Sequence, residues 1–118
     1  MILGRVSPEG EPTITVPIAG QDWKTIIDTG FNGDLELPLS LQDSLNASYV
    51  GRVTSALAGG QVIEEILYLV DFPFDGRIVS AQATFVADTH ILLGTHLLRD
   101  YSLLVNFMSK LVQLERVA

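Results

Sequence analysis

The residues Ile26-Ile27-Asp28-Thr29-Gly30 form the most informative segment of this sequence. Isoleucine is enriched in β-strands, whereas aspartate, threonine and glycine favour turns, so the segment predicts a strand that delivers a carboxylate into a tight turn. Backbone N–H groups can support the Asp28 carboxylate there, the Thr29 hydroxyl can donate a hydrogen bond that holds the turn, and Gly30 permits close backbone approach. Ordinary strand-ending turns use the same residue types, so the rest of the sequence must distinguish the two interpretations.

Short runs of β-forming residues, separated by turn residues, lie on both sides of this segment. Apolar and polar residues alternate over residues 13–18, which is typical of a half-buried strand. Pro17 lacks a backbone N–H, so this strand is expected to lie at an edge of the sheet or to end near Pro17. Ala58-Gly59-Gly60 predicts a hairpin turn, because glycine adopts positive φ at no steric cost. The expected strands cover residues 13–18, 23–27, 35–37, 49–57, 61–70, 77–87, 103–107 and 111–117.

Helical signals are few and short. One helix is expected over residues 40–45 with Ser40 as its N-cap, and another over residues 95–101 with Thr95 as its N-cap. Residues 72–76 are rich in turn formers and are expected to separate two strands. Many closely spaced strands with only two short helices predict an all-β barrel or sandwich-like fold.

The composition describes one small acidic domain. The chain has 118 residues, enough for a single domain over residues 1–118, and its 47% hydrophobic content is that of a globular protein. Seven basic and fourteen acidic side chains give a net charge of −7, which opposes nonspecific binding to nucleic acids or anionic membranes. There is no cysteine, no apolar run longer than five residues and no signal-peptide pattern, so a cytoplasmic protein is expected.

Three blocks of the sequence, in this order, resemble a known family. They are the Asp-Thr-Gly segment extended to Gly33, the glycine-tipped hairpin over residues 56–61, and Ile91-Leu92-Leu93-Gly94 with the leucines that follow it. This combination resembles the retroviral-like, single-domain aspartic proteases of the retropepsin type, and more closely their small bacterial relatives. The resemblance implies a closed all-β acid-protease barrel with one or two short helices, and an aspartic endopeptidase without a cofactor.

The resemblance also implies a role for each matching position. Asp28 would be the catalytic aspartate, Thr29 would brace two active-site loops across a dimer interface, and Gly30 would let the loop pass close to substrate. The segment over residues 91–94 would pack behind the catalytic loop. The residues implied to contact a bound peptide are the position after the Asp-Thr-Gly and the tip of a flap: Phe31, Ala58, Gly59 and Gly60.

Several positions depart from the family pattern. Most active members place alanine or serine where this chain has Phe31, whereas small bacterial relatives accept phenylalanine before a pair such as Asn32-Gly33. His96 stands where an acidic or amide residue is commoner. The expected C-terminal strand pair, over residues 103–117, is longer than the single terminal strand that retroviral enzymes interleave in their dimers.

The chain contains one Asp-Thr-Gly, whereas aspartic-protease chemistry requires two carboxylates that share one proton, because like charges about 3 Å apart cannot both ionise cheaply. One carboxylate acts as base on a water molecule, and the protonated one donates to the scissile carbonyl oxygen. In Asp88-Thr89-His90 a histidine replaces the glycine, so this segment is not a second copy of the motif. The second carboxylate is therefore expected from another copy of the chain, in a symmetric homodimer that takes a peptide or protein substrate.

Other interpretations remain open. A dimeric peptide-binding or assembly module could keep the same architecture without catalysis, and Phe31 favours that alternative. Metal binding is the weaker alternative, because metals need three or four converging ligands and no known ligand spacing is present, so no metal is expected. The two sets of side chains considered for it are Asp88, His90 and His96, and Asp28, Asp34 and Glu36.

Overall fold

The structure is a computed structural model that describes residues 1–118, with ten strands and one short 3₁₀ helix. The helix, η1, spans Leu39–Ser44. The strands follow one another with these bounds: β1 Ile2–Val6, β2 Pro12–Ile18, β3 Gln21–Ile27, β4 Leu35–Pro38, β5 Ser48–Ala56, β6 Val62–Phe74, β7 Arg77–Val86, β8 Ile91–Leu93, β9 Tyr101–Asn106 and β10 Leu111–Arg116.

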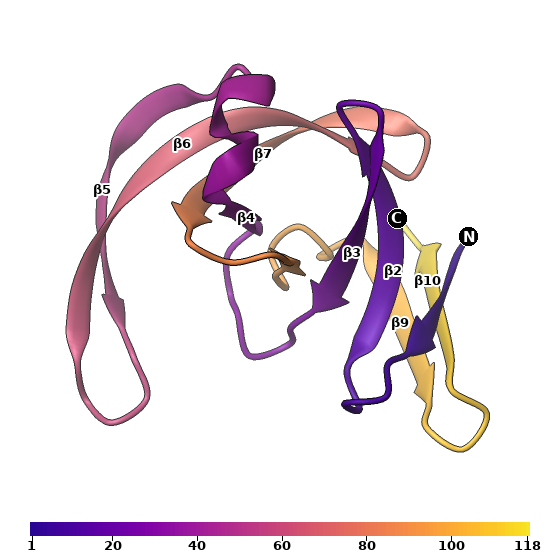
Figure 1. Cartoon of the computed structure of the whole chain (residues 1–118). Helices are drawn as coiled ribbons and strands as arrows, with labels where there is room; N and C mark the ends of the chain where they lie inside the picture. Colours follow the sequence, from indigo (N-terminus) through magenta and orange to yellow (C-terminus); the bar gives the residue numbers. More distant parts are fainter.

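All ten strands belong to one sheet, in the order β5-β6-β7-β4-β8-β3-β2-β1-β10-β9. Figure 1 shows this sheet strongly curled, with the β5–β6 hairpin on one side and the β9–β10 hairpin on the other. The all-β prediction is confirmed. The sheet is more open than the expected closed barrel, because β5 pairs only with β6 and β9 only with β10, so no ladder joins the two edges.

Strand β8 lies at the centre of the arrangement. It pairs in parallel with β3, where Ile27 is opposite Leu93, and antiparallel with β4, where Leu35 is opposite the same Leu93. The two ends of the segment over residues 28–34 are thus fixed against one residue of β8. This pairing makes the segment a short loop that leaves the sheet and returns to it.

The connections between neighbouring strands follow local turn chemistry. The β2–β3 turn at Ala19-Gly20 has φ values of 52° and 77°, and the β6–β7 turn at Asp75-Gly76 has values of 55° and 75°. Positive φ at both central residues is the conformation that matches the twist of a tight hairpin. Strand β6 continues to Phe74, so the expectation of a turn over residues 72–76 holds only for its last two residues.

Strand β2 has one free side, as Pro17 predicts. It pairs with β1 only at Pro12 and Thr13, whereas its pairing with β3 continues to Ile18. Pro17 therefore lies in the part of β2 where the loss of a backbone donor disrupts no second ladder. The expected edge position is confirmed for that part of the strand.

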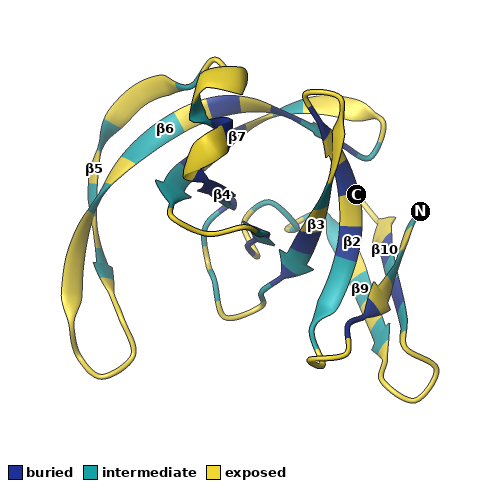
Figure 2. Cartoon of the chain, viewed as in Figure 1, coloured by how far each residue is buried: buried dark blue, intermediate teal, exposed yellow.

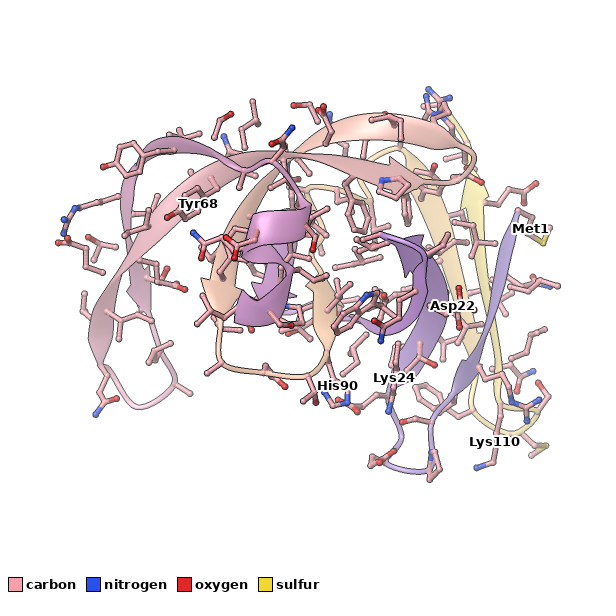
Figure 3. All side chains as sticks on the ribbon, turned by 45° about the horizontal axis from the view of Figure 1, so that its top comes forward. Met1, Asp22, Lys24, Tyr68, His90 and Lys110 are labelled. Carbon is pink, nitrogen blue, oxygen red and sulfur yellow. The ribbon has the colours of Figure 1, made fainter.

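The helical expectations are partly wrong. The 3₁₀ helix Leu39–Ser44 has Pro38 at its N-cap position and no side-chain cap, so Ser40 is not the cap. The hydroxyl of Tyr68, labelled on β6 in Figure 3, accepts a hydrogen bond of 3.2 Å from Gln42 Nε2 in this helix. Residues 95–100 form successive turns and no helix: the backbone hydrogen bonds within this segment join residues three apart, Arg99 N to His96 O and Tyr101 N to Leu98 O.

The core lies inside the curl of the sheet, where one side chain in two points inward. Figure 2 shows the buried segments on the central strands, whereas the far part of the β5–β6 hairpin is exposed. No helix has the length and apolar character needed to span a membrane. The buried apolar side chains are Val6, Ile14, Val16, Ile18, Ile27, Leu35, Leu37, Leu41, Leu45, Val70, Phe72, Phe74, Ala81, Ala83, Ile91, Leu93, Val112 and Leu114.

Candidate functional site

Asp28 lies directly after β3, at the start of the loop that β8 fixes at both ends. Its backbone N–H donates to the Leu93 carbonyl oxygen at 3.0 Å, and its own carbonyl accepts from Phe31 N at 3.1 Å. Its carboxylate oxygen Oδ1 accepts from Gly30 N at 2.9 Å, as the turn chemistry predicts. In the single chain Asp28 is half-buried and Thr29 and Gly30 are exposed, so this triplet is available at the surface.

The segment after β8 holds this loop from behind. Three backbone hydrogen bonds join them: Gly94 N to Asp34 O at 2.9 Å, Thr95 N to Phe31 O at 2.8 Å, and His96 N to Gly33 O at 3.2 Å. A β-carbon added at Gly94 would overlap the Gly33 carbonyl group and lie 2.8 Å from Phe31 O. Only glycine permits this close approach of two backbones, which explains why an apolar strand ends in glycine here.

Asp34 is a central residue of the loop that sequence reasoning considered only as a cation ligand. It is 6% exposed, its Oδ2 accepts from Gln82 N of β7 at 2.9 Å, and its Oδ1 lies 2.5 Å from His96 Nδ1. One buried carboxylate thus joins the loop to β7 and to the turns after β8. The unusual histidine at position 96 was the only signal for this pair, and 62 residues separate the two partners.

A cleft of about 510 Å³ lies between this loop and the β5–β6 hairpin. Phe31 lines it from the loop, and Glu36 and Glu65 line it from β4 and β6. Burial raises the pKa of Glu36 above its ordinary value, and the carboxylates of Glu65, Asp88 and Asp28 raise it further. Asp28 itself does not line the cleft, but Gly30 and Phe31 of its loop do, so the cleft opens next to the Asp-Thr-Gly turn.

The three residues expected at a flap tip lie at the end of the β5–β6 hairpin. Ala58, Gly59 and Gly60 are exposed, and the two glycines have φ values of 91° and 84°. The turn is closed by hydrogen bonds at 2.7 Å and 3.2 Å, which both involve Leu57. These tip residues are not among those that line the cleft, whereas Phe31 is.

The side chains considered as metal ligands meet only in pairs. No group of three or more histidine, aspartate or glutamate side chains is arranged to hold a metal ion. His90 Nδ1 lies 3.3 Å from Asp88 Oδ1 in an exposed pair, and His96 is bonded to Asp34 instead.

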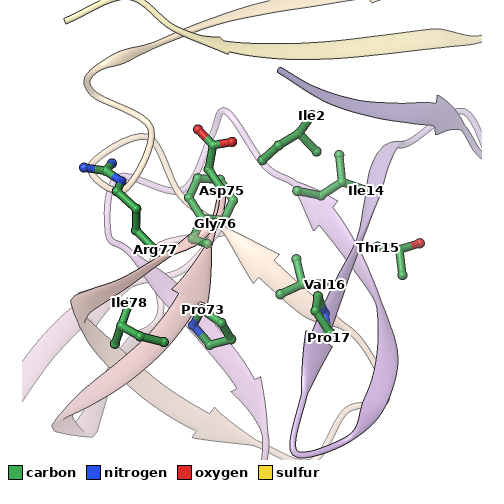
Figure 4. Close-up of a pocket in the computed structure, with 11 residues that line it drawn as sticks. Ile2, Ile14, Thr15, Val16, Pro17, Pro73, Asp75, Gly76, Arg77 and Ile78 are labelled. Carbon is green, nitrogen blue, oxygen red and sulfur yellow. The ribbon is translucent and has the colours of Figure 1, made fainter.

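A second cavity, of about 310 Å³, lies away from Asp28. Figure 4 shows Ile14 and Val16 of β2 on one side of it, and Asp75 and Arg77 at the β6–β7 turn on the other. Most of its exposed lining is apolar, and it contains no pair of carboxylates. It has no element of the chemistry that the Asp-Thr-Gly suggests.

Comparison with solved structures identifies the fold. A retropepsin-like aspartic protease from Rickettsia conorii superposes with a TM-score of 0.69 at 18% identity, over 96% of this chain and 88% of that one. The EIAV protease, solved in complex with the inhibitor HBY-793, superposes with a TM-score of 0.61 at 20% identity, over 80% of this chain and 90% of that one. The Simian Foamy Virus (mac) protease superposes with a TM-score of 0.56 at 20% identity, over 74% of this chain and 91% of that one. No protein-family model and no curated protein sequence matches the chain. The chain therefore has the retropepsin fold.

Proposed function

We propose that this chain, which has the retropepsin fold, is an aspartic endopeptidase that acts as a homodimer. The observation that carries the proposal is the position of Asp28: it follows β3 directly, is held by Leu93 of β8, and presents its carboxylate at the surface beside a peptide-sized cleft. Solved retropepsin-like proteases with the same fold support the assignment of a peptide or protein substrate.

The chemistry explains why a second chain is needed. One Asp28 carboxylate takes a proton from a water molecule, whose oxygen attacks the peptide carbonyl carbon, while the protonated carboxylate of the partner's Asp28 donates to the carbonyl oxygen. The tetrahedral intermediate then collapses: the first Asp28 gives the proton it took from water to the amide nitrogen, the partner's Asp28 takes back a hydroxyl proton, and the C–N bond breaks to leave a carboxylic acid and an amine. A single half-buried carboxylate cannot be acid and base at once, so the monomer holds half of the site.

Surface features on the side of Asp28 support a symmetric dimer. In the view of Figure 1 the loop over residues 28–34, the β5–β6 turn and the β9–β10 turn all point toward the bottom of the molecule. At the β9–β10 turn Phe107 is 65% exposed and Met108 is 96% exposed. Two apolar side chains at an exposed turn are better placed in an interface than in water, and a second copy would cover them.

The test compares Asp28→Asn with the unmodified chain on denatured casein, from about pH 3 to pH 7, after sedimentation has verified the dimer. In a homodimer this substitution replaces both carboxylates of the acid–base pair, so kcat is expected to fall by a factor of about 10³ or more. Asp88→Asn is the matched control, because Asp88 precedes a threonine in the same way but lies in an exposed pair with His90. Cleavage that survives Asp28→Asn, or a verified dimer without cleavage at any of these pH values, would refute the proposal.

A second candidate is a peptide-binding module that does not cleave. The Phe31 ring favours it, since this ring lies over Gly33, where an added β-carbon would be 2.8 Å from Phe31 Cε1, and lines the cleft beside Asp28. Such a module would bind peptides equally well before and after Asp28→Asn and would release no products. An enzyme would instead lose turnover with this substitution.

A further inference from the structure

The cleft beside the Asp28 loop carries charges of one sign. The charged side chains that line it are those of Asp34, Glu36 and Glu65, and no lysine, arginine or histidine takes part. Asp34 is already bonded to His96 and to the backbone of Gln82. The two glutamates are therefore the charges that this cleft presents to a bound molecule.

Glu36 is held in position by the strands on either side of β4. It lies opposite Thr84 of β7 and opposite Leu92 of β8. Its neighbours Leu35 and Leu37 are buried, so side-chain alternation along β4 turns Glu36 to the other face, where it is half-buried in the cleft lining. None of the ion pairs in the structure includes Glu36.

Glu65 faces the cleft from the hairpin. It is half-buried and lies opposite Val53, which lines the cleft as well. The adjacent Glu64 is outside this lining and forms an exposed ion pair of 2.6 Å with Arg52. Glu65 takes part in none of the ion pairs, so two carboxylates without cationic partners face the cleft from its two walls.

This arrangement has an electrostatic cost that a cation would relieve. Burial and the like charge of Glu65 are the two largest causes of the raised pKa of Glu36. A positive group in the cleft would favour both ionised carboxylates, whereas an anionic group would add a third like charge. The apolar wall at Val53 and Leu67 would suit an aliphatic stem better than a free metal ion.

We propose that the cleft binds a peptide segment with a lysine or arginine side chain, which lies between Glu36 and Glu65. The aliphatic stem would pack along Val53 and Leu67, and the cationic head would meet the carboxylates. The inference rests on the proposed function only in assigning a peptide to this cleft. It specifies the substrate class that the Asp28 site accepts.

The test measures peptide binding by the full chain with Asp28→Asn, which prevents cleavage. The probes are four fluorescein-labelled pools of eight-residue peptides, uncharged and random except for one central residue: lysine, arginine, norleucine or glutamate. Fluorescence anisotropy in about 0.15 M salt, which screens distant charges, is expected to give a Kd about tenfold lower for the lysine and arginine pools than for norleucine. Equal affinities for lysine and norleucine, or no binding by any pool, would overturn the inference.

Three single variants separate the cleft from the overall negative charge. Glu36→Gln, Glu65→Gln and Glu64→Gln each remove one negative charge, but only the first two change the cleft lining. We expect a roughly threefold loss of the lysine preference for Glu36→Gln and Glu65→Gln and none for Glu64→Gln. Equal losses for all three would mean that net charge alone attracts the peptides, which contradicts the inference.

The outcome is distinguishable from that of the proposed function. The lysine–norleucine comparison does not require these variants to fold, and Trp23 fluorescence reports whether each one does. A preserved lysine preference without casein cleavage by the unmodified chain would refute the endopeptidase and leave this inference intact. Casein cleavage together with equal affinity for the lysine and norleucine pools would support the endopeptidase and refute this inference.

Discussion

Gly94→Ala tests the close packing behind the candidate catalytic loop. The added methyl group would overlap the Gly33 carbonyl and lie 2.8 Å from Phe31 O, and both are backbone groups that cannot rotate away. The loop must move, which strains the three hydrogen bonds that Gly94, Thr95 and His96 donate to it. Each such bond contributes about 1 kcal/mol net, and overpacking costs about 1–3 kcal/mol, so we expect a loss of about 4–6 kcal/mol in the free energy of unfolding.

Urea denaturation, followed by the fluorescence of the single tryptophan, Trp23, measures this loss. Trp23 packs against the core, so its emission reports global unfolding. For a chain of this length, the expected loss corresponds to a fall in Tm of about 16–24 °C. The protein concentration must be constant between variants, because dimerisation would add concentration-dependent stability.

Gly51→Ala is the matched control. An added β-carbon at Gly51 meets no atom within 4 Å, and its φ is outside the left-handed region, so the change is expected to stay within about 0.5 kcal/mol. If Gly94→Ala unfolds at the same urea concentration as Gly51→Ala, the close backbone approach does not hold the loop. Folded Gly94→Ala protein should also lose casein cleavage, whereas Gly51→Ala should retain it.

Three further predictions concern stability. His96→Ala removes a partner of buried Asp34, so it should lower the free energy of unfolding, measured in urea, by about 1–3 kcal/mol. His90→Ala, from an exposed pair, should lower it by at most about 0.5 kcal/mol. Equal losses would contradict the structural role of the Asp34–His96 pair. Because the folded pKa of Glu36 is raised, its ionisation opposes folding as pH rises above about 4.5. Glu36→Gln should therefore raise the free energy of unfolding more at pH 7 than at pH 3.5. An equal change at the two pH values would refute this. Ala19→Asn should add up to about 1 kcal/mol, since Ala19 has a φ of 52° and asparagine tolerates positive φ; a lower Tm would contradict it.

Local patterns in the sequence predicted most of the strands and the position of the candidate catalytic residue. Alternation over residues 13–18 and the turn residues after Ile27 depend only on neighbours along the chain, and both predictions agree with β2 and with the end of β3. The expected helix over residues 95–101 is wrong, because the segment forms only single turns with hydrogen bonds between residues three apart. The N–H groups of Thr95 and His96 donate to carbonyls of the loop over residues 28–34, and no local signal reveals this contact between segments far apart in the sequence.

The sequence alone predicts that the Asp-Thr-Gly lies directly after a strand, because strand alternation and turn preferences act over a few residues. A mechanism of the kind proposed above, with two Asp-Thr-Gly carboxylates, would need a second copy of this chain, because these 118 residues contain one such motif. Long-range packing was needed to pair Asp34 with His96 and to bring Glu36 and Glu65 to one cleft. The order of the strands in the sheet sets these contacts, and that order depends on which apolar faces bury one another across the whole chain.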